Sequence, residues 1–556
     1  MTEYNILLLT NRDSDNVGDQ VIEACDIALI KAVMKNLNID KSEYKIKSHS
    51  ASIVTKQYMK IREEKYLEKA RTLIKEADLV IFGGAPVFNY LYQTFYERTA
   101  ITLELAQEYG KPVIFSAIGI EQYDEEDVKC QRLKKTLNFD CVKQITTRDG
   151  IEELKKYKKK EQLVIARVSD PAVFSKEIFG KYIKEKANKK KIGLFVFRSN
   201  GFKDNKIPFT KEDAAKLWKN IIKELENKGY EYTLLTSGHF NDEAFMDYLI
   251  RNHGIEESKC IFNINSPERL LEVMSTLDGV ISCRLHPSII SYSLGTPSVG
   301  LVWNPKVKFF YDCIEYSERR IDITETDACG IVERLEKALQ QGVNRKKEYL
   351  ITVYQYLFLG IKNALHITEE AVTPYDYEQL IENISEFTGT SANEKGLKLK
   401  RKFRRSYELL NDLQKLENVE TPYTMYYHSG EKGEQIVPVE DWKEKVDGNM
   451  RRLPTGAMEC TVRKMVNNDG TAIFVDNLYQ NEKKRFKGWR VRFLIKDTWF
   501  WYLENGGFCK KETYQKRING KIKIFLPGET IPNIPLVGVA LVVAEASWIG
   551  KICWRI

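Results

Sequence analysis

The feature that most constrains the fold is an alternation of short apolar runs and longer helical patterns through roughly the first 380 residues. Runs rich in apolar and β-branched residues predict buried strands at 4–10, 78–82, 112–117 and 144–147, with helical spacing at 19–37 and 96–109 between them. A second series predicts strands at 192–197, 232–236, 260–264, 279–282 and 298–301. Two successive strand–helix series are typical of two doubly wound parallel sheets.

The length of 556 residues exceeds what one ordinary hydrophobic core holds. We therefore expect an α/β protein with one Rossmann-like domain at 1–180, a second at 190–385, and the lysine-dense stretch 181–191 between them. A small polar linker at 387–396 leads into a basic linker helix at 397–420. Residues 421–556 are predicted to form a β-sandwich-like accessory domain, because six of the eight tryptophans follow position 440 and short alternating runs are separated by turn residues.

The composition narrows the function classes. The 86 Lys and Arg residues against 78 Asp and Glu give a net charge of +8, which suits an acidic ligand or an anionic surface but is too diffuse to indicate nucleic acid. The ten cysteines include no CxxC pair, so we expect reduced thiols, a cytoplasmic location and no metal site. No secretion signal or membrane-spanning helix is expected, and no HExxH, P-loop, GxSxG or EF-hand pattern occurs.

Two loops that follow predicted strands are the first candidate ligand sites. In the loop 13–20, Asn16 and Gly18 favour a tight turn, and Asp19 is placed to cap the next helix so that backbone N–H groups point into a cleft. The alternative is an ordinary strand-to-helix turn. After the strand 78–82, Gly83 and Gly84 allow a ligand to approach the backbone closely, although paired glycines also simply terminate strands.

Cationic and imidazole side chains follow further strands. Arg148 comes directly after 144–147, where it can hold a phosphate or carboxylate, or else form a surface ion pair with Asp149 or a nearby glutamate. Arg284 and His286 come directly after 279–282 and open a small-residue helix at 288–294, and Lys306 follows the next strand. This placement offers cationic anchors, an imidazole that exchanges a proton and a helix N-terminus that favours anions. The alternative is a histidine packed at a helix start.

One further histidine is a weaker candidate. His239 lies in the loop after the strand 232–236, a position from which it could line the same cleft and contact a ligand. The other four histidines fall in no pattern that indicates a function.

In order along the chain, these segments resemble the polysaccharide pyruvyltransferase family over about residues 1–380. The matching pieces are DNVGDQ (15–20), ADLVIFGGAPVF (77–88), KPVIFSAIGI (111–120), TTRDG (146–150), SDPAVF (169–174), ISCRLHPSIISYSLGTPSVGL (281–301) and WNPK (303–306). The resemblance implies two Rossmann-like lobes facing a cleft, as in two-domain (GT-B) glycosyltransferases. It also implies phosphoenolpyruvate as donor substrate without a cofactor, and a lipid-linked or nucleotide-linked glycan precursor as acceptor.

The resemblance also implies roles for individual residues. Arg148 resembles the family's anion-binding arginine, Arg284 and His286 its RLH pair, and Lys306 a basic donor-binding residue. Forming a cyclic pyruvate ketal requires protonation of the donor's methylene carbon, stabilisation of a cation and expulsion of phosphate. We therefore expect His286 to be the general acid/base, the three cationic side chains to neutralise the donor, and Asp19 to orient or deprotonate an acceptor hydroxyl.

This chain departs from the family pattern at three positions. Ala85 and Pro86 stand where the family commonly continues a glycine run, and Asp15 replaces a glycine often found before Asn-x-Gly-Asp. Residues 397–556 lie outside the resemblance altogether.

Two other functions remain open at this point. A glycosyltransferase of the same fold would use Arg284 and Lys306 to hold the diphosphate of a nucleotide-sugar. A non-catalytic scaffold for glycan assembly would act through its C-terminal region, whose aromatic residues at 489 and 499–502 either stack on sugar rings or form the core of a small sandwich.

Expectations about partners follow from the same segments. The basic helix either rests peripherally on the inner face of the plasma membrane or is a solvated connection. Homo-oligomerisation is left open, and no nucleic-acid partner is expected.

Overall fold

The computed structural model describes residues 3–394 except 92–94, 189, 199–201, 203, 204, 206, 262, 263, 325, 326, 369–371, 392 and 393, and beyond 394 only the backbone of six strands. At 240, 241, 244, 247, 251, 252 and 257 it describes the backbone alone. The chain divides into two compact units, 1–193 with 270–389 and 194–269 with 390–556. The residue ranges of these units differ from those of the expected domains 1–180 and 190–385, and the expected domain boundaries stay predictions.

The first sheet has six strands in the order β2-β1-β3-β4-β5-β6, and its pairings are parallel. The strands are β1 (Tyr4–Thr10), β2 (Tyr44–Ser50), β3 (Leu79–Gly83), β4 (Val113–Ile118), β5 (Val142–Thr147) and β6 (Val164–Arg167). The strand order reverses between β1 and β3. In doubly wound sheets a ligand binds outside the carboxyl ends of the strands at such a switch point.

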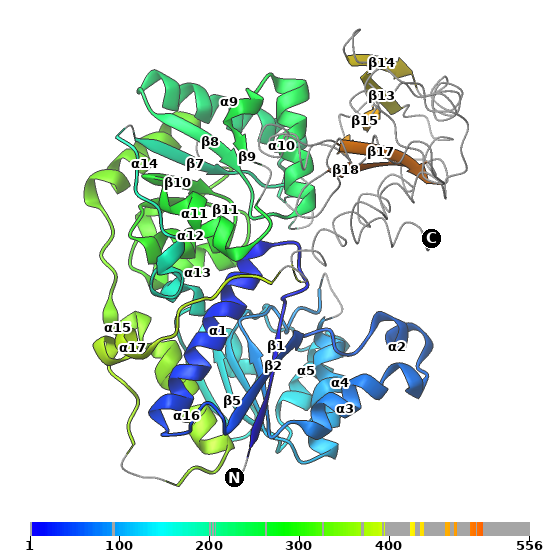
Figure 1. Ribbon diagram of the computed structural model, residues 1–556, viewed down its shortest axis with the longest axis vertical. Coiled ribbons are helices and arrows are strands. Elements are labelled where there is room, and N and C mark those ends of the chain that lie inside the picture. The colour runs from blue at the N-terminus through cyan, green and yellow to red at the C-terminus, as the bar shows by residue number, and fades with distance from the viewer. Residues whose placement is uncertain are drawn as a thin grey trace, which may run out of the picture. The chain divides into compact units, whose positions relative to one another are not determined.

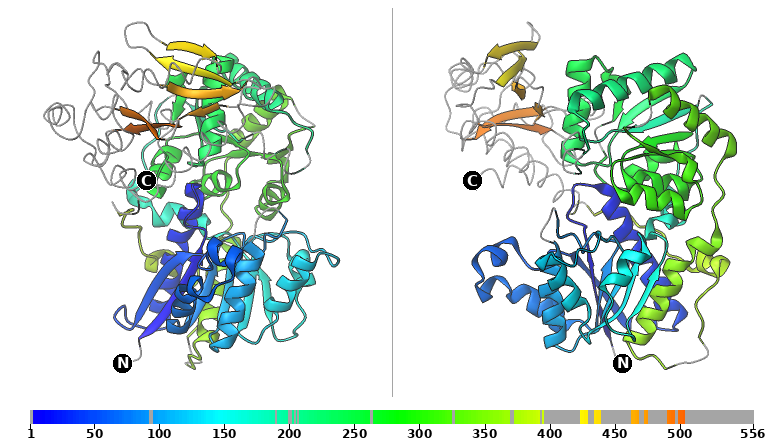
Figure 2. Two further views of the ribbon diagram at one scale, coloured as in Figure 1. Left: turned by 90° about the vertical axis from the view of Figure 1, so that its right-hand side faces the viewer. Right: turned by 180° about the vertical axis from the view of Figure 1, so that it is seen from behind.

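Helices cover both faces of this sheet. Figures 1 and 2 show α1 (Val17–Asn36) and α16 (Thr352–Ala364) on one face, and α3 (Glu68–Glu76), α4 (Phe95–Glu108) and α5 (Val128–Leu137) on the other. The central strands are therefore continuous apolar runs rather than alternating ones. The rings of Phe82 and Phe115 stack with centroids 4.6 Å apart in the core beneath α3, α4 and α5.

The second sheet also has six strands, in the order β12-β11-β10-β7-β8-β9. They are β7 (Lys191–Phe195), β8 (Glu231–Leu235), β9 (Cys260–Ile261), β10 (Gly279–Ser282), β11 (Ser298–Val302) and β12 (Arg320–Asp322). The order reverses between β7 and β10, which is the Rossmann arrangement. The predicted fold class, two Rossmann-like doubly wound sheets, is confirmed.

The remaining described helices connect these strands or follow them. They are α2 (Lys56–Ile61), α6 (Ile151–Tyr157), α7 (Ser175–Ile178), α9 (Lys211–Asn227), α10 (Phe240–His253), α11 (Pro267–Ser275), α12 (Leu285–Leu294), α13 (Pro305–Cys313), α14 (Ala328–Gln341), α15 (Lys347–Leu350) and α17 (Tyr377–Asn383). Short 3-10 turns occur at Glu64–Tyr66, Pro171–Phe174, Gly180–Tyr182, Glu257–Lys259 and Ser317–Arg319. No helix among the described residues is both long and apolar enough to cross a membrane.

The C-terminal region is described only as strand backbone. The strands are β13 (Tyr423–His428), β14 (Glu434–Pro438), β15 (Val462–Asn467), β16 (Ala472–Phe474), β17 (Arg490–Ile495) and β18 (Thr498–Leu503). They pair antiparallel in the orders β14-β13-β15-β16 and β17-β18, as a β-rich region should. The predicted basic helix at 397–420 and the role of the aromatic side chains at 489 and 499–502 lie outside what the structure describes.

Candidate functional site

The loop after β1 lies at the switch point of the first sheet and ends in the helix cap of α1. The Asn16 side chain caps the helix, because its Oδ1 accepts the Gly18 backbone N–H at 3.2 Å. Asp19 lies in the first helical turn, is 7% exposed and accepts a hydrogen bond from Asn11 Nδ2 at 3.0 Å. A buried carboxyl therefore lies at the positive end of a 20-residue helix.

His286 reaches this loop from the second sheet. It lies in the first turn of α12, which begins three residues earlier than the predicted helix 288–294, with Arg284 as its N-cap residue. His286 Nδ1 lies 3.0 Å from Asn16 Nδ2, and its Nε2 lies 3.9 Å from Asp19 Oδ1. A Cβ added to Gly18 would lie 2.5 Å from His286 Cβ and Cγ, so only glycine leaves room for the ring. All of these residues belong to one compact unit.

The two titratable groups of this contact have opposite pKa shifts. The pKa of His286 is lowered well below 6.5 by burial and by the charges of Arg148, Arg284 and Lys306. The pKa of Asp19 is raised to about 6 by burial, against the lowering effects of a hydrogen bond with Ser14 and the charge of Arg148. Near neutral pH the imidazole is therefore uncharged, and the carboxyl is the group that titrates closest to that range.

Arg148 contributes charge from a buried position. Its side chain is 6% exposed and forms an ion pair with Asp170, whose side chain is 1% exposed, at the ends of the neighbouring strands β5 and β6. The pair is buried, unlike the surface ion pair considered from the sequence. Burial lowers the pKa of Arg148, but the charges of Asp170 and Asp149 raise it by more, so the guanidinium stays charged. Direct contact of this guanidinium with a ligand would have to compete with Asp170.

Lys306 lies in the first turn of α13, where Asn304 caps the helix by accepting the Lys306 N–H. A Cβ added to Gly119 would lie 3.4 Å from Lys306 Nζ and 3.5 Å from Asp149 Oδ2, so the ammonium group lies beside the loop after β4. Lys306 is half-buried. The charge of Lys306 also lowers the pKa of His286, so the two side chains interact electrostatically.

The glycine pair after β3 serves helix packing. A Cβ on Gly84, whose φ is +46°, would overlap Ile22 of α1, and a Cβ on Gly83 would lie 2.9 Å from Asp26 Cγ of the same helix. The two glycines thus let α1 lie directly on the end of β3. Their predicted contact with a ligand stays a prediction.

His239 lies in the other compact unit, in the loop after β8. Its Nδ1 is 4.0 Å from Asp242 Oδ1, and its side chain is 13% exposed. The predicted contribution of His239 to the cleft stays a prediction. Among the described residues, no group of three or more His, Cys, Asp or Glu side chains could hold a metal ion.

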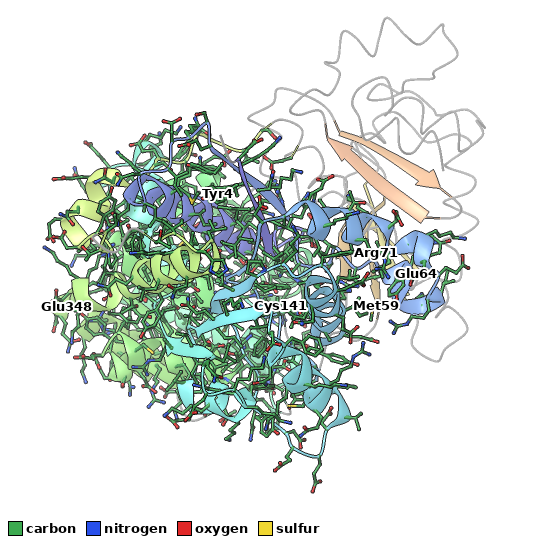
Figure 3. All side chains as sticks on the ribbon, turned by 90° about the horizontal axis from the view of Figure 1, so that it is seen from below. Tyr4, Met59, Glu64, Arg71, Cys141 and Glu348 are labelled. Atoms are coloured by element: carbon green, nitrogen blue, oxygen red, sulfur yellow. The ribbon has the colours of Figure 1, made fainter. Side chains whose placement is uncertain are left out.

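A cavity of about 480 Å³ lies away from this site, at the amino ends of the strands of the first sheet. Its lining includes Tyr4 and Cys141, both labelled in Figure 3, together with Asp78, Lys143 and His366. The carboxyl ends, where Asn16, Asp19 and Arg148 lie, are the opposite edge.

Sequence reasoning assigned no role to four residues that shape the site. Asn11 donates to Asp19, and Asp170 neutralises Arg148. Glu121 Oε2 accepts the backbone N–H groups of Tyr90 and Leu91, which ties the loops after β3 and β4 together near Lys306. Asp26 is buried two helical turns after Asp19. No local signal pointed to Asp170, because the edge strand β6 before it was not predicted and the need for a partner arises from the burial of Arg148.

The sequence matches a family model described as polysaccharide pyruvyl transferase over residues 16–305, more than half of the 556 residues. No curated protein matches it. The chain is similar to the solved UDP-GlcNAc 2-epimerase of Methanocaldococcus jannaschii in complex with UDP-GlcNAc and UDP, at 10% identity and a TM-score of 0.40, with 64% of this chain and 99% of that chain covered. The Neisseria meningitidis UDP-GlcNAc 2-epimerase bound to UDP-GlcNAc is similar at 11% identity and a TM-score of 0.41, with 65% of this chain and 100% of that chain covered. The wall teichoic acid polymerase TagF is similar at 12% identity and a TM-score of 0.35, with 66% of this chain and 90% of that chain covered.

Proposed function

Because the chain belongs to the polysaccharide pyruvyl transferase family, we propose that it transfers the pyruvyl group of phosphoenolpyruvate to two hydroxyls of a glycan precursor, forming a ketal. The observation that carries the proposal is a neutral imidazole in contact with a protonatable carboxyl among fixed positive charges. His286 is the imidazole and Asp19 is the carboxyl. The fixed positive charges are those of Arg148, Arg284 and Lys306.

The charges of this site complement the proposed donor. Phosphoenolpyruvate carries a carboxylate and a phosphate on adjacent positions of a three-carbon skeleton. In this proposal the half-buried Arg284 and Lys306 bind these groups, and Arg148, which is buried in its ion pair with Asp170, contributes positive potential. Preorganised charges in a site that excludes water are usually the largest contribution to catalysis.

The proposed reaction balances without an outside reactant. The first hydroxyl oxygen bonds to C2 of the donor while a proton is added to the C3 methylene, which becomes the methyl group. The second hydroxyl oxygen then bonds to C2 as the C2–O bond to phosphate breaks, and phosphate leaves with the remaining hydroxyl proton. Two proton transfers therefore need an acid/base group, a requirement that Asp19 and His286 together meet.

Donor binding tests the proposal before any acceptor is known. Phosphoenolpyruvate at about 100 times its Kd should stabilise the folded protein by about 2.7 kcal/mol, visible as a rise in Tm, whereas UDP-GlcNAc at the same concentration should not. Lys306→Ala should weaken phosphoenolpyruvate binding by about 10- to 100-fold, since hydrogen bonds to charged groups contribute about 1.5–3 kcal/mol. Lys308→Ala, an exposed lysine two residues along the same helix, is the matched control.

The result that contradicts the proposal is equally direct. If UDP-GlcNAc raises Tm in a Lys306-dependent manner and phosphoenolpyruvate does not, the site takes a nucleotide-sugar instead. The acceptor, a lipid-linked or nucleotide-linked glycan, then has to be sought by phosphate release from phosphoenolpyruvate with each acceptor class. A cytoplasmic location, with peripheral contact at the inner face of the plasma membrane, belongs to the same proposal.

A further inference from the structure

The orientation of the Asn16 amide is fixed by the backbone of its own helix. A backbone N–H can only donate, so the atom that accepts from Gly18 N at 3.2 Å must be the amide oxygen of Asn16. The amide nitrogen is then the atom that lies 3.0 Å from His286 Nδ1. Capping of α1 thus decides which end of Asn16 meets the imidazole.

This orientation determines the tautomer of His286. An amide nitrogen only donates, so Nδ1 must accept with its lone pair. The lowered pKa of His286 keeps the ring neutral, and a neutral ring carries one proton. That proton is left on Nε2, the nitrogen that lies 3.9 Å from Asp19 Oδ1.

We propose that Asn16 is a positioning residue that holds His286 as the Nε2–H tautomer, so that the ring donates toward Asp19 and the reacting groups and leaves proton uptake to the Asp19 carboxylate. The tautomer follows from contacts within the protein alone, whereas its catalytic meaning rests on the proposed function. It revises the expectation that His286 itself is the general base.

The chemistry of the two groups agrees with this division. With Nδ1 covered by Asn16 and Nε2 protonated, the imidazole has no lone pair to offer a hydroxyl. The Asp19 carboxylate has acceptor capacity, and its pKa of about 6 allows it to take up and return a proton near neutral pH. The Nε2–H group can stabilise the ionised carboxylate or an oxygen of the donor as negative charge develops.

The charges that face the ring come from four elements. Arg148 follows β5, and Arg284 is the N-cap residue of α12, without a capping hydrogen bond from its side chain. Lys306 lies in the first turn of α13, and Asp19 lies in the first turn of α1. Three of these are cations and resist protonation of the ring. A new carboxylate at position 16 would act in the opposite direction.

The tautomer can be measured on the full chain without substrate. Long-range ¹H–¹⁵N correlation spectra of histidine-labelled protein distinguish a protonated from an unprotonated ring nitrogen, and His286→Gln identifies the signals of this ring. We expect protonated Nε2 and unprotonated Nδ1 at neutral pH. Asn16→Asp should move the proton to Nδ1 and raise the imidazole pKa, because a carboxylate accepts and carries charge. Asp caps helices as well as Asn does, so α1 should still form.

Two comparisons separate positioning from structure. Asn38→Asp makes the same substitution at an exposed position just beyond the C-terminal end of α1 and should leave the His286 spectrum unchanged. Asn16→Ala, which removes both hydrogen bonds, should loosen the ring and lower the rate of phosphate release from phosphoenolpyruvate at least about tenfold. Its circular dichroism spectrum should match that of the unsubstituted protein.

The outcomes distinguish this inference from the proposed function. An Nδ1–H ring in the unsubstituted protein, or an Asn16→Asp spectrum identical to it, overturns the assignment to Asn16. If the spectra agree with the assignment but the unsubstituted protein neither binds nor consumes phosphoenolpyruvate, the tautomer stands and the proposed function fails.

Discussion

Replacing Asp26 by asparagine should make the protein progressively more stable, relative to the unsubstituted protein, as the pH rises. Asp26 is 1% exposed, and neither carboxyl oxygen has a hydrogen-bond partner among the described residues. Burial, then the charges of Asp170 and Glu23, raise its pKa well above 3.8, against the lowering effect of Arg148. The folded protein therefore holds this side chain as a neutral acid packed against Gly83.

The sign of the pH dependence follows from linkage. In the unfolded chain Asp26 ionises above about pH 4, while in the folded chain it stays protonated to higher pH. Its contribution to stability is fully present below the unfolded pKa and is lost as the pH rises toward the folded pKa, at about 1.4 kcal/mol per pH unit. The asparagine side chain of the variant cannot ionise, so the stability difference between Asp26→Asn and the unsubstituted protein should grow at that rate.

The assay is urea unfolding of both proteins at a series of pH values between about 5 and 8. A constant offset is expected from the different hydrogen-bonding groups of asparagine, so the slope with pH is the quantity that tests the reasoning. Asp40→Asn is the control, because Asp40 is exposed, its pKa is lowered by hydrogen bonds from Ser42, and it stays ionised across this range. A difference between Asp26→Asn and the unsubstituted protein that does not change with pH would refute the claim that Asp26 is held protonated.

Three further perturbations address the site itself. Gly18→Ala should keep α1, since Ala favours helix by about 1 kcal/mol over Gly, but should displace His286 and lower kcat/KM about 100-fold, measured with phosphoenolpyruvate. In the unsubstituted protein kcat/KM should rise with pH through about 6 as Asp19 ionises, and Asp19→Asn should abolish this step along with most activity, as a pH–rate profile would show. Asp170→Ala should cost about 3–5 kcal/mol in urea unfolding, because it leaves the buried charge of Arg148 without its partner.

The order of strands along the chain was predictable from the sequence, but three of the four edge strands were not. Strand β1 matches its predicted range, because a strand covered on both faces must be a continuous apolar run. The missed strands β2, β6 and β12 all lie at sheet edges, where one side is open and the residues are mixed in polarity. Tyr44–Ser50, for example, alternates lysine and serine with isolated apolar residues.

The candidate site was predictable as a set of residues but not as a set of contacts. Arg148, Arg284 and His286 each follow a strand, so the rule that ligands bind at carboxyl ends was enough to select them. The contact of His286 with Asn16 spans 270 residues and depends on how α12 meets α1, which no local pattern encodes. Asp170 and Asp26 were passed over because their importance comes from burial, and a carboxylate in a sequence is ordinarily a surface residue.

The glycines of this site connect the packing of α1 to its chemistry. Gly83 and Gly84 admit Asp26 and Ile22, which fix the helix against β3, while Gly18 admits the imidazole at the first turn of the same helix. Both sets of contacts determine where Asp19 lies. It is in the first turn of α1, next to Gly18, and on the same helical face as Asp26. A glycine-rich pattern that suggests a ligand loop therefore also determines where a rigid helix lies, and the spacing of Asp19 and His286 depends on that position. Substitutions in the glycine pair should for this reason act on proton transfer even though neither glycine carries a functional group.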